Sequence, residues 1–411
     1  MYPNPERQSW QAKPGLALAI CAVAALAEGF DNQAMGVAGP GVIREFHLAP
    51  DVAGWLFSLG TLGQAVGATL GGYIADRITR KWALVVSLLL LGAGCLGIIV
   101  AEGTQSLFAM RAVTGLGLGG ALPNFINLAT EAVPASQRLR LVTLLMAALP
   151  AGGTLAAVTG LAHSMGWSWR SIFVVGGTVP LLVSAVALAL PRGSAQKDRE
   201  AMAAANSSGA GSGPSPLSTL FGEGRAPTTL WLWVGLFFIQ LILLLMLNWL
   251  PTLLVRAGFS STQASGAQIG FSIGGAIGGF LIGRLQSSRR QRLGVLTTYL
   301  GVAAALATAG LALGDYRTVV LASAVAGLFI IGAQLAMYAA APLYYPRAIR
   351  GTGVGCALAV GRLGSVVGPL FAGFLVAAGG TASTVFLGIE PFVLIAGAAA
   401  IALCSRRQAP G

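Results

Sequence analysis

Charged side chains are scarce in this sequence. Only 9% of its 411 residues are Asp, Glu, Lys or Arg, whereas soluble domains carry about 25%. Hydrophobic residues make up 55% of the chain, and the mean hydropathy is +0.77. A soluble chain of this composition would have too little polar surface to face water. The shortage of charge therefore excludes a cytosolic enzyme, a disordered chain and a secreted disulfide scaffold.

Residues that bind metals or form disulfides are also few. The two histidines, His47 and His163, fall at predicted helix ends, and neither an HExxH nor a Walker motif is present. The cysteines lie in apolar runs without CxxC spacing, so we interpret them as small core residues. They are Cys21, Cys95, Cys356 and Cys404. The sequence predicts no metal site, no cofactor and no nucleotide-driven pump, and its polar N-terminus lacks a signal-peptide pattern.

Apolar segments of membrane-spanning length follow one another along the chain. A helix needs about 20 apolar residues to cross a bilayer, and helices are required because isolated strands leave backbone groups unsatisfied in lipid. The predicted fold is therefore all-α, with twelve transmembrane helices. Their approximate boundaries are 15–39, 54–75, 82–101, 105–129, 141–163, 171–190, 228–250, 264–285, 293–314, 318–341, 353–378 and 384–404.

Basic residues gather on one side of these segments. If the N-terminus is cytoplasmic, nineteen of the 25 Lys and Arg residues fall in cytoplasmic loops or termini, and Arg111 and Arg362 fall within spans. The positive-inside rule then predicts that both termini are cytoplasmic. The net charge of +12 is explained by this topology, so we expect no nucleic-acid partner. The outer side has Arg44, Arg170, Arg256 and Arg317.

A polar linker divides the twelve spans six and six. Residues 191–227 include a stretch rich in Gly, Ser and Pro, which is typical of flexible linkers. Residues 71–78 and 278–285 resemble each other and lie at equivalent span ends. Such internal symmetry is typical of two-bundle transporters, whose site lies between the repeats. We predict an N-terminal bundle over 1–190, a cytoplasmic linker over 191–227 and a C-terminal bundle over 228–411.

The loop after the second span carries a motif. Residues 72–81 read Gly-Tyr-Ile-Ala-Asp-Arg-Ile-Thr-Arg-Lys and resemble the signature loop of the major facilitator superfamily, except that Thr79 stands where the family usually has glycine. In the second half, Gly283 replaces the aspartate. The resemblance implies two six-helix bundles and a cytoplasmic gate of ion pairs; the alternative is a solvated basic loop. The predicted gating residues are Asp76, Arg77, Arg80, Glu131, Arg138 and Arg350.

The first span contains two carboxylates, Glu28 and Asp31, which are three residues apart and share one helix face. Carboxylates within a membrane are costly and need partners or protons. The stretch Glu-Gly-Phe-Asp resembles the acidic-Gly-aromatic-Asp motif of the aromatic acid/proton symporters in that superfamily. The resemblance extends along nearly the whole chain, including residues 111–124, 248–251 and 360–364. It implies import of an aromatic carboxylate, of the hydroxyphenylpropionate or hydroxybenzoate kind, together with protons.

Asp31 and Arg111 are predicted to lie at similar depth. Asp31 is about eight residues, or roughly 12 Å, below the outer end of the first span, and Arg111 about six residues, or roughly 9 Å, below that of the fourth. A carboxylate whose cationic partner changes with conformation can act as a proton switch. With the resemblance, this assigns proton coupling to Glu28, Asp31 and Arg111. The alternative is a static buried pair that joins the two spans.

Arg362 lies about nine residues into the eleventh span, where it needs an anion. Its guanidinium suits a substrate carboxylate; a structural pair is the alternative. Other polar or aromatic residues in the spans could bind the rest of the substrate or serve as interhelical contacts. The predicted substrate-binding residues are Arg362, Phe30, Asn127, Gln240, Asn248, Trp249, Gln334 and Tyr338.

Two motifs point to other functions. Gly115, Gly117 and Gly120 spell GxGxxG, but no strand precedes them, so we interpret them as sites of close helix approach. Residues 270–274 spell the serine-hydrolase pattern GxSxG without an intramembrane histidine. We therefore predict a transporter rather than an enzyme, working as a monomer in the inner membrane. The alternative is a proton-coupled exporter on the same fold, although its Gly-x-x-x-Gly-Pro pattern is poorly matched in the fifth span.

Overall fold

The computed structural model describes residues 14–77, 79–162, 166–188, 220–222, 224–286, 291–346 and 349–406. The predicted linker falls largely outside these residues, as do the N-terminal segment before Pro14 and His163. In the first half of the chain the helices are α2 (Pro14–Glu45), α3 (Pro50–Arg77), α4 (Arg80–Ile99), α5 (Thr104–Glu131), α6 (Ala135–Leu161) and α7 (Arg170–Leu188).

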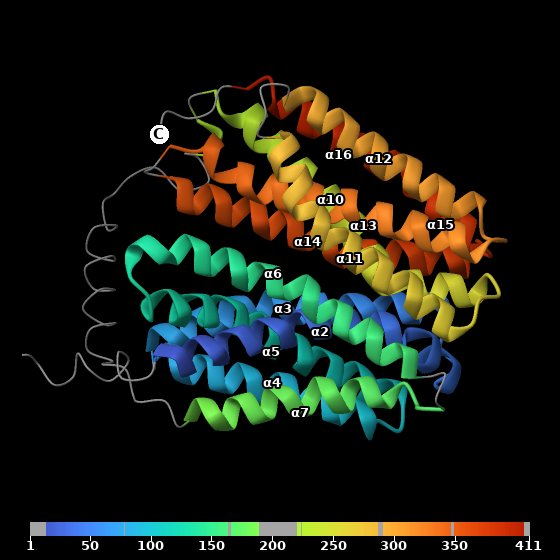
Figure 1. The fold of residues 1–411 in the computed structure, drawn as a ribbon, viewed down its shortest axis with the longest axis horizontal. Coiled ribbons are helices and arrows are strands. Elements are labelled where there is room, and N and C mark those ends of the chain that lie inside the picture. Colours follow the sequence, from blue (N-terminus) through green and yellow to red (C-terminus); the bar gives the residue numbers. More distant parts are fainter. Residues whose placement is uncertain are drawn as a thin grey trace, which may run out of the picture. The chain divides into compact units, whose positions relative to one another are not determined.

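The second half is also helical throughout its described residues. Its elements are α10 (Ala226–Arg256), α11 (Ser261–Gln286), α12 (Gln291–Leu311), α13 (Tyr316–Ala340), the 3-10 helix η3 (Ala341–Tyr344), α14 (Arg350–Ala377), α15 (Ala382–Gly388) and α16 (Glu390–Leu403). No strand occurs in the part of the chain that the structure describes. Figure 1 shows these helices as long rods, with α11 packed along α13, α4 along α5 and α10 along α14.

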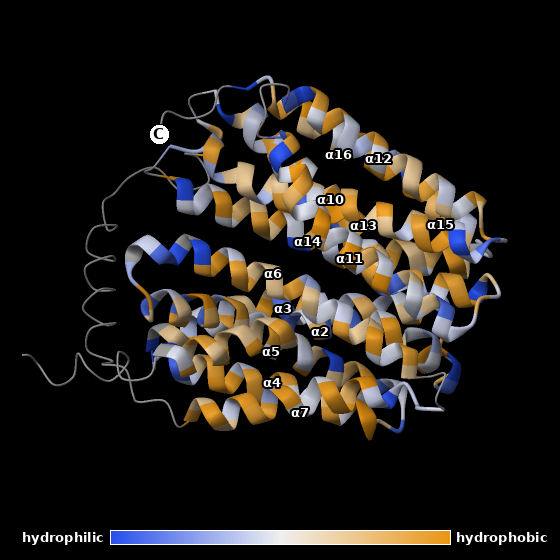
Figure 2. Ribbon diagram, in the orientation of Figure 1, coloured by the Kyte–Doolittle hydropathy of each residue, from blue (hydrophilic) through white to orange (hydrophobic). Residues whose placement is uncertain are grey.

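The prediction of an all-α membrane fold with twelve spanning segments is confirmed. Each predicted span coincides with helix over nearly all of its described residues, and ten helical segments are long and apolar enough to cross a membrane by length and hydropathy. The other two are α3 and α5, which are rich in glycine but have 28 residues each, enough for about 42 Å. Hydrophilic residues gather at the helix ends and connections, whereas the helix middles are mostly hydrophobic (Figure 2).

The last predicted span differs from the expectation of one continuous helix over 384–404. The structure divides it into α15 and α16, with Ile389 between them. Pro391 explains the break, because proline has no backbone N–H and its ring clashes with the carbonyl four residues earlier. Glu390 then occupies the first turn of α16, where a carboxylate interacts favourably with the helix dipole.

The GxGxxG stretch of α5 is a packing surface. Gly115 lies against the carbonyl oxygen of Gly60 on α3, and Gly117 lies against the backbone of α4 at Ser87 and Leu91. Gly120 lies against the side chain of Ser87. Any Cβ at these positions would collide with its neighbour. The interpretation as sites of close helix approach is therefore confirmed, as expected for small residues between membrane helices.

Two compact units divide the described chain. The first comprises residues up to Ala34, Leu59–Ala156 and the residues from Trp167 to 188. The second comprises Met35–Ser58, the described residues of Ala157–Gly166 and those from 220 onward. The helices α2, α3 and α6 therefore each contribute to both units. The division into bundles over 1–190 and 228–411 stays a prediction.

Candidate functional site

A buried ion pair joins α2 and α5 in the first unit. Arg111 Nη1 donates to Asp31 Oδ2 at 3.1 Å, and the two residues are 4% and 1% exposed. The prediction that these residues meet is confirmed. Removing one partner of such a pair leaves an uncompensated buried charge, which costs about 3–5 kcal/mol.

Cys95 completes the environment of Asp31, a role that the sequence interpretation missed. Its Sγ donates to Asp31 Oδ1 at 3.3 Å, so both carboxylate oxygens have a donor. Cys95 lies on α4 and is fully buried, as a small core residue would be. A signal for this contact was present: Cys95 is about six residues from the outer end of its predicted span, the same depth as Arg111.

Gly60 on α3 leaves the space that the Arg111 guanidinium fills. A Cβ at Gly60 would lie within 2.7 Å of Nη2 and 2.6 Å of Cζ of Arg111. The neighbour is the end of a flexible side chain rather than backbone. A substitution at Gly60 would therefore displace the guanidinium without separating the helices.

We expect Gly60→Ala to fold but to lose most of its proton-driven uptake. The added methyl displaces Arg111 from Asp31, and misplacement by about 1 Å can cost about 100-fold. The matched control is Gly72→Ala on the same helix, because nothing lies within 4 Å of a Cβ there. Initial rates of substrate uptake into proteoliposomes, at equal amounts of folded protein, measure the effect. Equal uptake by the two variants would contradict the role given to Gly60.

Gly29, which stands between Glu28 and Phe30 on α2, is in close contact with the backbone of Leu149 on α6. Gly152 lies against the carbonyl oxygen of Leu26 and the amide of Phe30. Glu28 is 2% exposed, so its carboxyl group is held within the protein. Phe30 packs against Gly176 of α7, with its ring 3.2 Å from a Cβ at that glycine. The structure thus places Phe30 in packing between helices within the first unit.

A polar cluster lies in the second unit. Gln334 Nε2 on α13 donates to Gln240 Oε1 on α10 at 2.8 Å, and Gln240 Nε2 donates to the Tyr338 hydroxyl at 2.8 Å. These bonds orient the Gln240 amide and leave the phenolic hydrogen of Tyr338 to donate elsewhere. Arg362 on α14 is half-buried and near enough for its charge to act on the Tyr338 hydroxyl. Gly361, next to it, lies against Gln240.

Two other predicted substrate residues, Trp249 and Asn248, lie farther along α10 than Gln240. Trp249 is nine residues beyond Gln240 on α10, about 13 Å along the helix. Its Nε1 donates to the carbonyl oxygen of Pro369 at 3.0 Å, and its ring meets the edge of Phe57. Asn248 is buried, and its Nδ2 donates to the carbonyl of its own helix. Asn127 on α5 is exposed.

The predicted gate contains one ion pair among the described residues. Arg80 and Glu131 pair directly, and both are more than a third exposed. Arg350 donates from Nε to the Tyr345 carbonyl at 3.3 Å, whereas Arg138 is exposed. Exposed pairs contribute little to stability, so the Arg80–Glu131 pair can break at low cost. The side chain of Asp76 lies outside the described residues.

Two further details concern the loop between α3 and α4. Thr79, which replaces the family's glycine, is the N-cap of α4, and its Oγ1 accepts from the amide of Trp82. Threonine is a preferred N-cap residue, so this departure from the family pattern has a local role. The guanidinium of Arg77 lies 4.2 Å from the centre of the Tyr73 ring. Arg77, which was predicted to take part in the gate, therefore makes a cation–π contact on its own helix.

Comparison with known proteins agrees with these observations. The chain is 39% identical to the 3-(3-hydroxy-phenyl)propionate transporter of Escherichia coli (strain K12), over 96% of this chain and 94% of that protein. It is 31% identical to a gallate transporter of Pseudomonas putida, over 96% and 92%. Both relatives are transporters of aromatic acids by name.

The fold has solved counterparts. A bacterial homologue of the human lysosomal transporter Spinster, in an inward-facing and occupied conformation, has a TM-score of 0.79 over the whole of both chains, with 18% identity. This likeness concerns the fold alone. The sequence model of the Major Facilitator Superfamily matches residues 21–314 and 258–411, which together cover all but the first 20 residues. The chain is therefore a multi-pass membrane protein that belongs to the Major Facilitator Superfamily.

Proposed function

We propose that this protein is an inner-membrane symporter that imports an aromatic carboxylate with protons by alternating access. The observation that carries the proposal is the buried Asp31–Arg111 pair, in which Cys95 also donates to the carboxylate. The names of the two relatives support the substrate class. A monoanion that enters with more than one proton carries net positive charge, so a negative interior draws it inward.

The proton would act through the charge balance of Arg111. When Asp31 is ionised, it pairs with Arg111 and both charges are compensated. When Asp31 takes up a proton, Arg111 loses its counter-ion and becomes free to attract another anion. The positive charge left on Arg111 favours entry of an anionic substrate, so uptake of the proton and of the substrate favour each other. Glu28, buried three residues earlier on α2, is the second proton-binding group in this proposal.

The Gln240–Gln334–Tyr338 cluster would form hydrogen bonds with the ring substituents of the substrate. The Tyr338 hydroxyl already accepts from Gln240 and retains its own hydrogen, so it can donate to a ring hydroxyl or a carboxylate oxygen. Arg362 would hold the carboxylate, because a guanidinium binds carboxylates through two parallel hydrogen bonds. The Arg80–Glu131 pair would belong to the cytoplasmic gate. A monomer contains all of these groups.

Transport by the purified protein in proteoliposomes tests the proposal. We expect accumulation of labelled 3-(3-hydroxyphenyl)propionate or gallate when the lumen is alkaline, and its loss when a protonophore collapses the gradient. The matched control substrate is the corresponding phenol without a carboxylate, which should not accumulate. Uptake that is indifferent to the proton gradient would contradict symport, and extrusion of the acid against its gradient would favour an exporter.

A further inference from the structure

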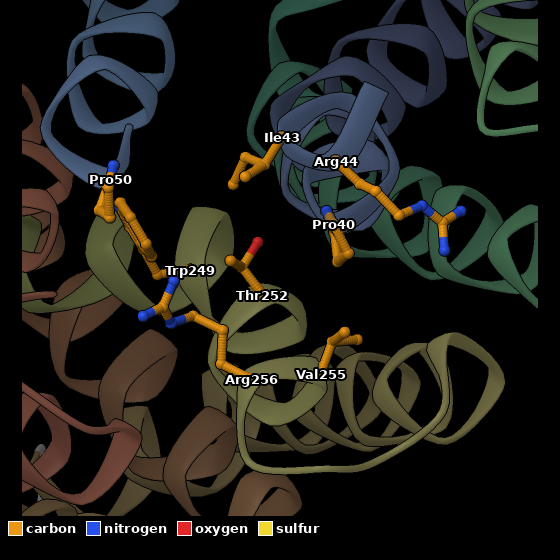
Figure 3. A pocket seen from close by; sticks show the side chains of 8 residues that line it. All are labelled: Pro40, Ile43, Arg44, Pro50, Trp249, Thr252, Val255 and Arg256. Carbon is orange, nitrogen blue, oxygen red and sulfur yellow. The ribbon is translucent and has the colours of Figure 1, made fainter. Parts of the chain in front are cut away.

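A small pocket lies in the second unit, at the ends of α2 and α10 that are predicted to face outward. Its volume is about 110 Å³, and its walls include Pro40 and Arg44 of α2 and Trp249, Thr252, Val255 and Arg256 of α10. Figure 3 shows these side chains around a shared space. Thr252 is twelve residues from Gln240, about 18 Å along α10. The pocket is therefore separate from the Gln240–Gln334–Tyr338 cluster.

Thr252 contributes a buried hydroxyl group without a hydrogen-bond partner among the described residues. Thr252 is only 3% exposed, and its Oγ1 bonds to none of the groups in the described part of the chain. Other threonines within helices bond to the carbonyl four residues earlier, as Thr114 does to Met110 and Thr154 does to Pro150. The Thr252 hydroxyl faces α2, where it would lie 2.9 Å from a Cβ at Gly39, and in Figure 3 it points into the space between Ile43 and Pro40. A buried hydroxyl left without a partner is costly, so this group indicates a ligand.

Two arginines flank the same pocket. Arg256 directs its guanidinium to the Trp249 side of the pocket, whereas the Arg44 side chain starts at the pocket wall and extends away from the other lining residues (Figure 3). Both arginines are exposed, and neither forms an ion pair within the described residues. Both also lie in the last turn of their helices, where a cation interacts favourably with the helix dipole. The helix dipole explains why arginines are found at these positions, but it does not explain the unbonded hydroxyl of Thr252 nearby.

The other two arginines predicted on the outer side are already engaged. Arg170 donates to the Ile99 carbonyl and lies over the Trp169 ring. Arg317 lies beside Asp315, whose pKa is held below its usual value chiefly by hydrogen bonds from Thr318. Arg44 and Arg256 are therefore the outer arginines that remain available to an anion.

We infer that this pocket captures the carboxylate of an aromatic acid on its way to Arg362 and the Gln240–Gln334–Tyr338 cluster. Arg256 and the Thr252 hydroxyl hold the carboxylate, the ring lies against Trp249 and Pro40, and Arg44 adds attraction at the mouth. Charge-assisted bonds to a guanidinium and a hydroxyl suit one carboxylate group, and the apolar walls suit an aromatic ring. This inference rests on the proposed function and on the predicted topology.

Sided transport kinetics test the inference. We expect Arg256→Gln to raise the KM for substrate on the outer side about tenfold and Thr252→Val, which keeps the shape of the side chain, to raise it about threefold. The maximal rate and the KM measured from the inner side should not change, because Arg362 and the Gln240–Gln334–Tyr338 cluster are unaltered. The matched control is Arg317→Gln, which removes the same charge from the same face outside the pocket.

The outcomes separate the inference from the proposed function. If wild-type protein does not transport aromatic carboxylates, the proposed function is wrong. If it does, and the outer KM of Arg256→Gln equals that of Arg317→Gln, the capture site is wrong and the arginine contributes only to the general field. If Arg256→Gln fails to fold, the Thr252→Val variant tests the inference instead. An outer KM of Thr252→Val equal to that of the wild type would contradict the inference. Inhibition by inorganic phosphate equal to that by benzoate would also overturn it, because it would show an anion site without preference for the ring.

Discussion

Replacing Asp31 with asparagine is expected to abolish uphill accumulation of substrate. Asparagine is isosteric with aspartate but cannot take up and release a proton, so the Arg111 guanidinium would keep the same partner in every state of the cycle. Proton-driven accumulation should fall to the equilibrium level. Exchange of labelled substrate on one side of the membrane for unlabelled substrate on the other should continue. Both quantities are measured in the same proteoliposomes, with and without an imposed pH gradient.

A folding control is needed for this substitution because Arg111 is only 4% exposed. Asp31→Asn leaves a buried guanidinium without its counter-ion, at a cost of about 3–5 kcal/mol if nothing compensates. The double variant Asp31→Asn with Arg111→Gln removes both charges and restores neutrality. We expect it to match the wild type in thermal stability but to remain uncoupled. Normal accumulation in Asp31→Asn would remove Asp31 from the coupling mechanism.

Replacing Arg362 with glutamine is expected to weaken substrate binding about 100-fold. Each charge-assisted hydrogen bond contributes about 1.5–3 kcal/mol, and 1.4 kcal/mol corresponds to a factor of ten in affinity. Losing the guanidinium also removes a positive charge that acts on the Tyr338 hydroxyl. The apparent Kd, measured by isothermal titration with the purified protein, reports the loss directly. Coupling should persist, because Asp31 and Arg111 are unchanged.

Two variants sharpen the test of Arg362. Arg362→Lys keeps the charge but not the planar fork, so we expect an affinity between those of the wild type and the glutamine variant. Tyr338→Phe removes only a hydroxyl group, so it should weaken binding of ring-hydroxylated acids while benzoate binding changes little. An unchanged Kd in Arg362→Gln would show that Arg362 has a structural role and that another cation holds the carboxylate.

The membrane fold and the Asp31–Arg111 contact were predictable from the sequence. Hydropathy is a sum over about 20 residues, so it identifies spans without knowledge of any contact. The depth of a residue in the membrane can also be estimated from its position in a predicted span, because each helical residue adds 1.5 Å along the axis. The similar depths of Asp31 and Arg111 therefore predicted a pair that the structure brings to 3.1 Å.

Other contacts of the site depend on how each helix is rotated about its axis, which depth does not specify. Cys95 had the right depth but was interpreted as a core residue, because a thiol gives no polarity signal to a hydropathy sum. Phe30 follows Glu28 closely on α2, yet it packs against Gly176 on another helix. Trp249 was grouped with Gln240 by residue type, although about 13 Å of α10 separates them.

The sequence by itself determined the all-helical membrane fold, the number of spans and the few charges that remain within them, because burying charge in lipid is costly at any rotation of a helix. Only the tertiary structure decided which groups meet: Cys95 with Asp31, Gly60 with Arg111, and Arg80 with Glu131. The physical reason is that these contacts form between side chains on separate helices. Their geometry follows from how closely the helix backbones approach, which short-range packing at glycine positions sets and hydropathy does not report.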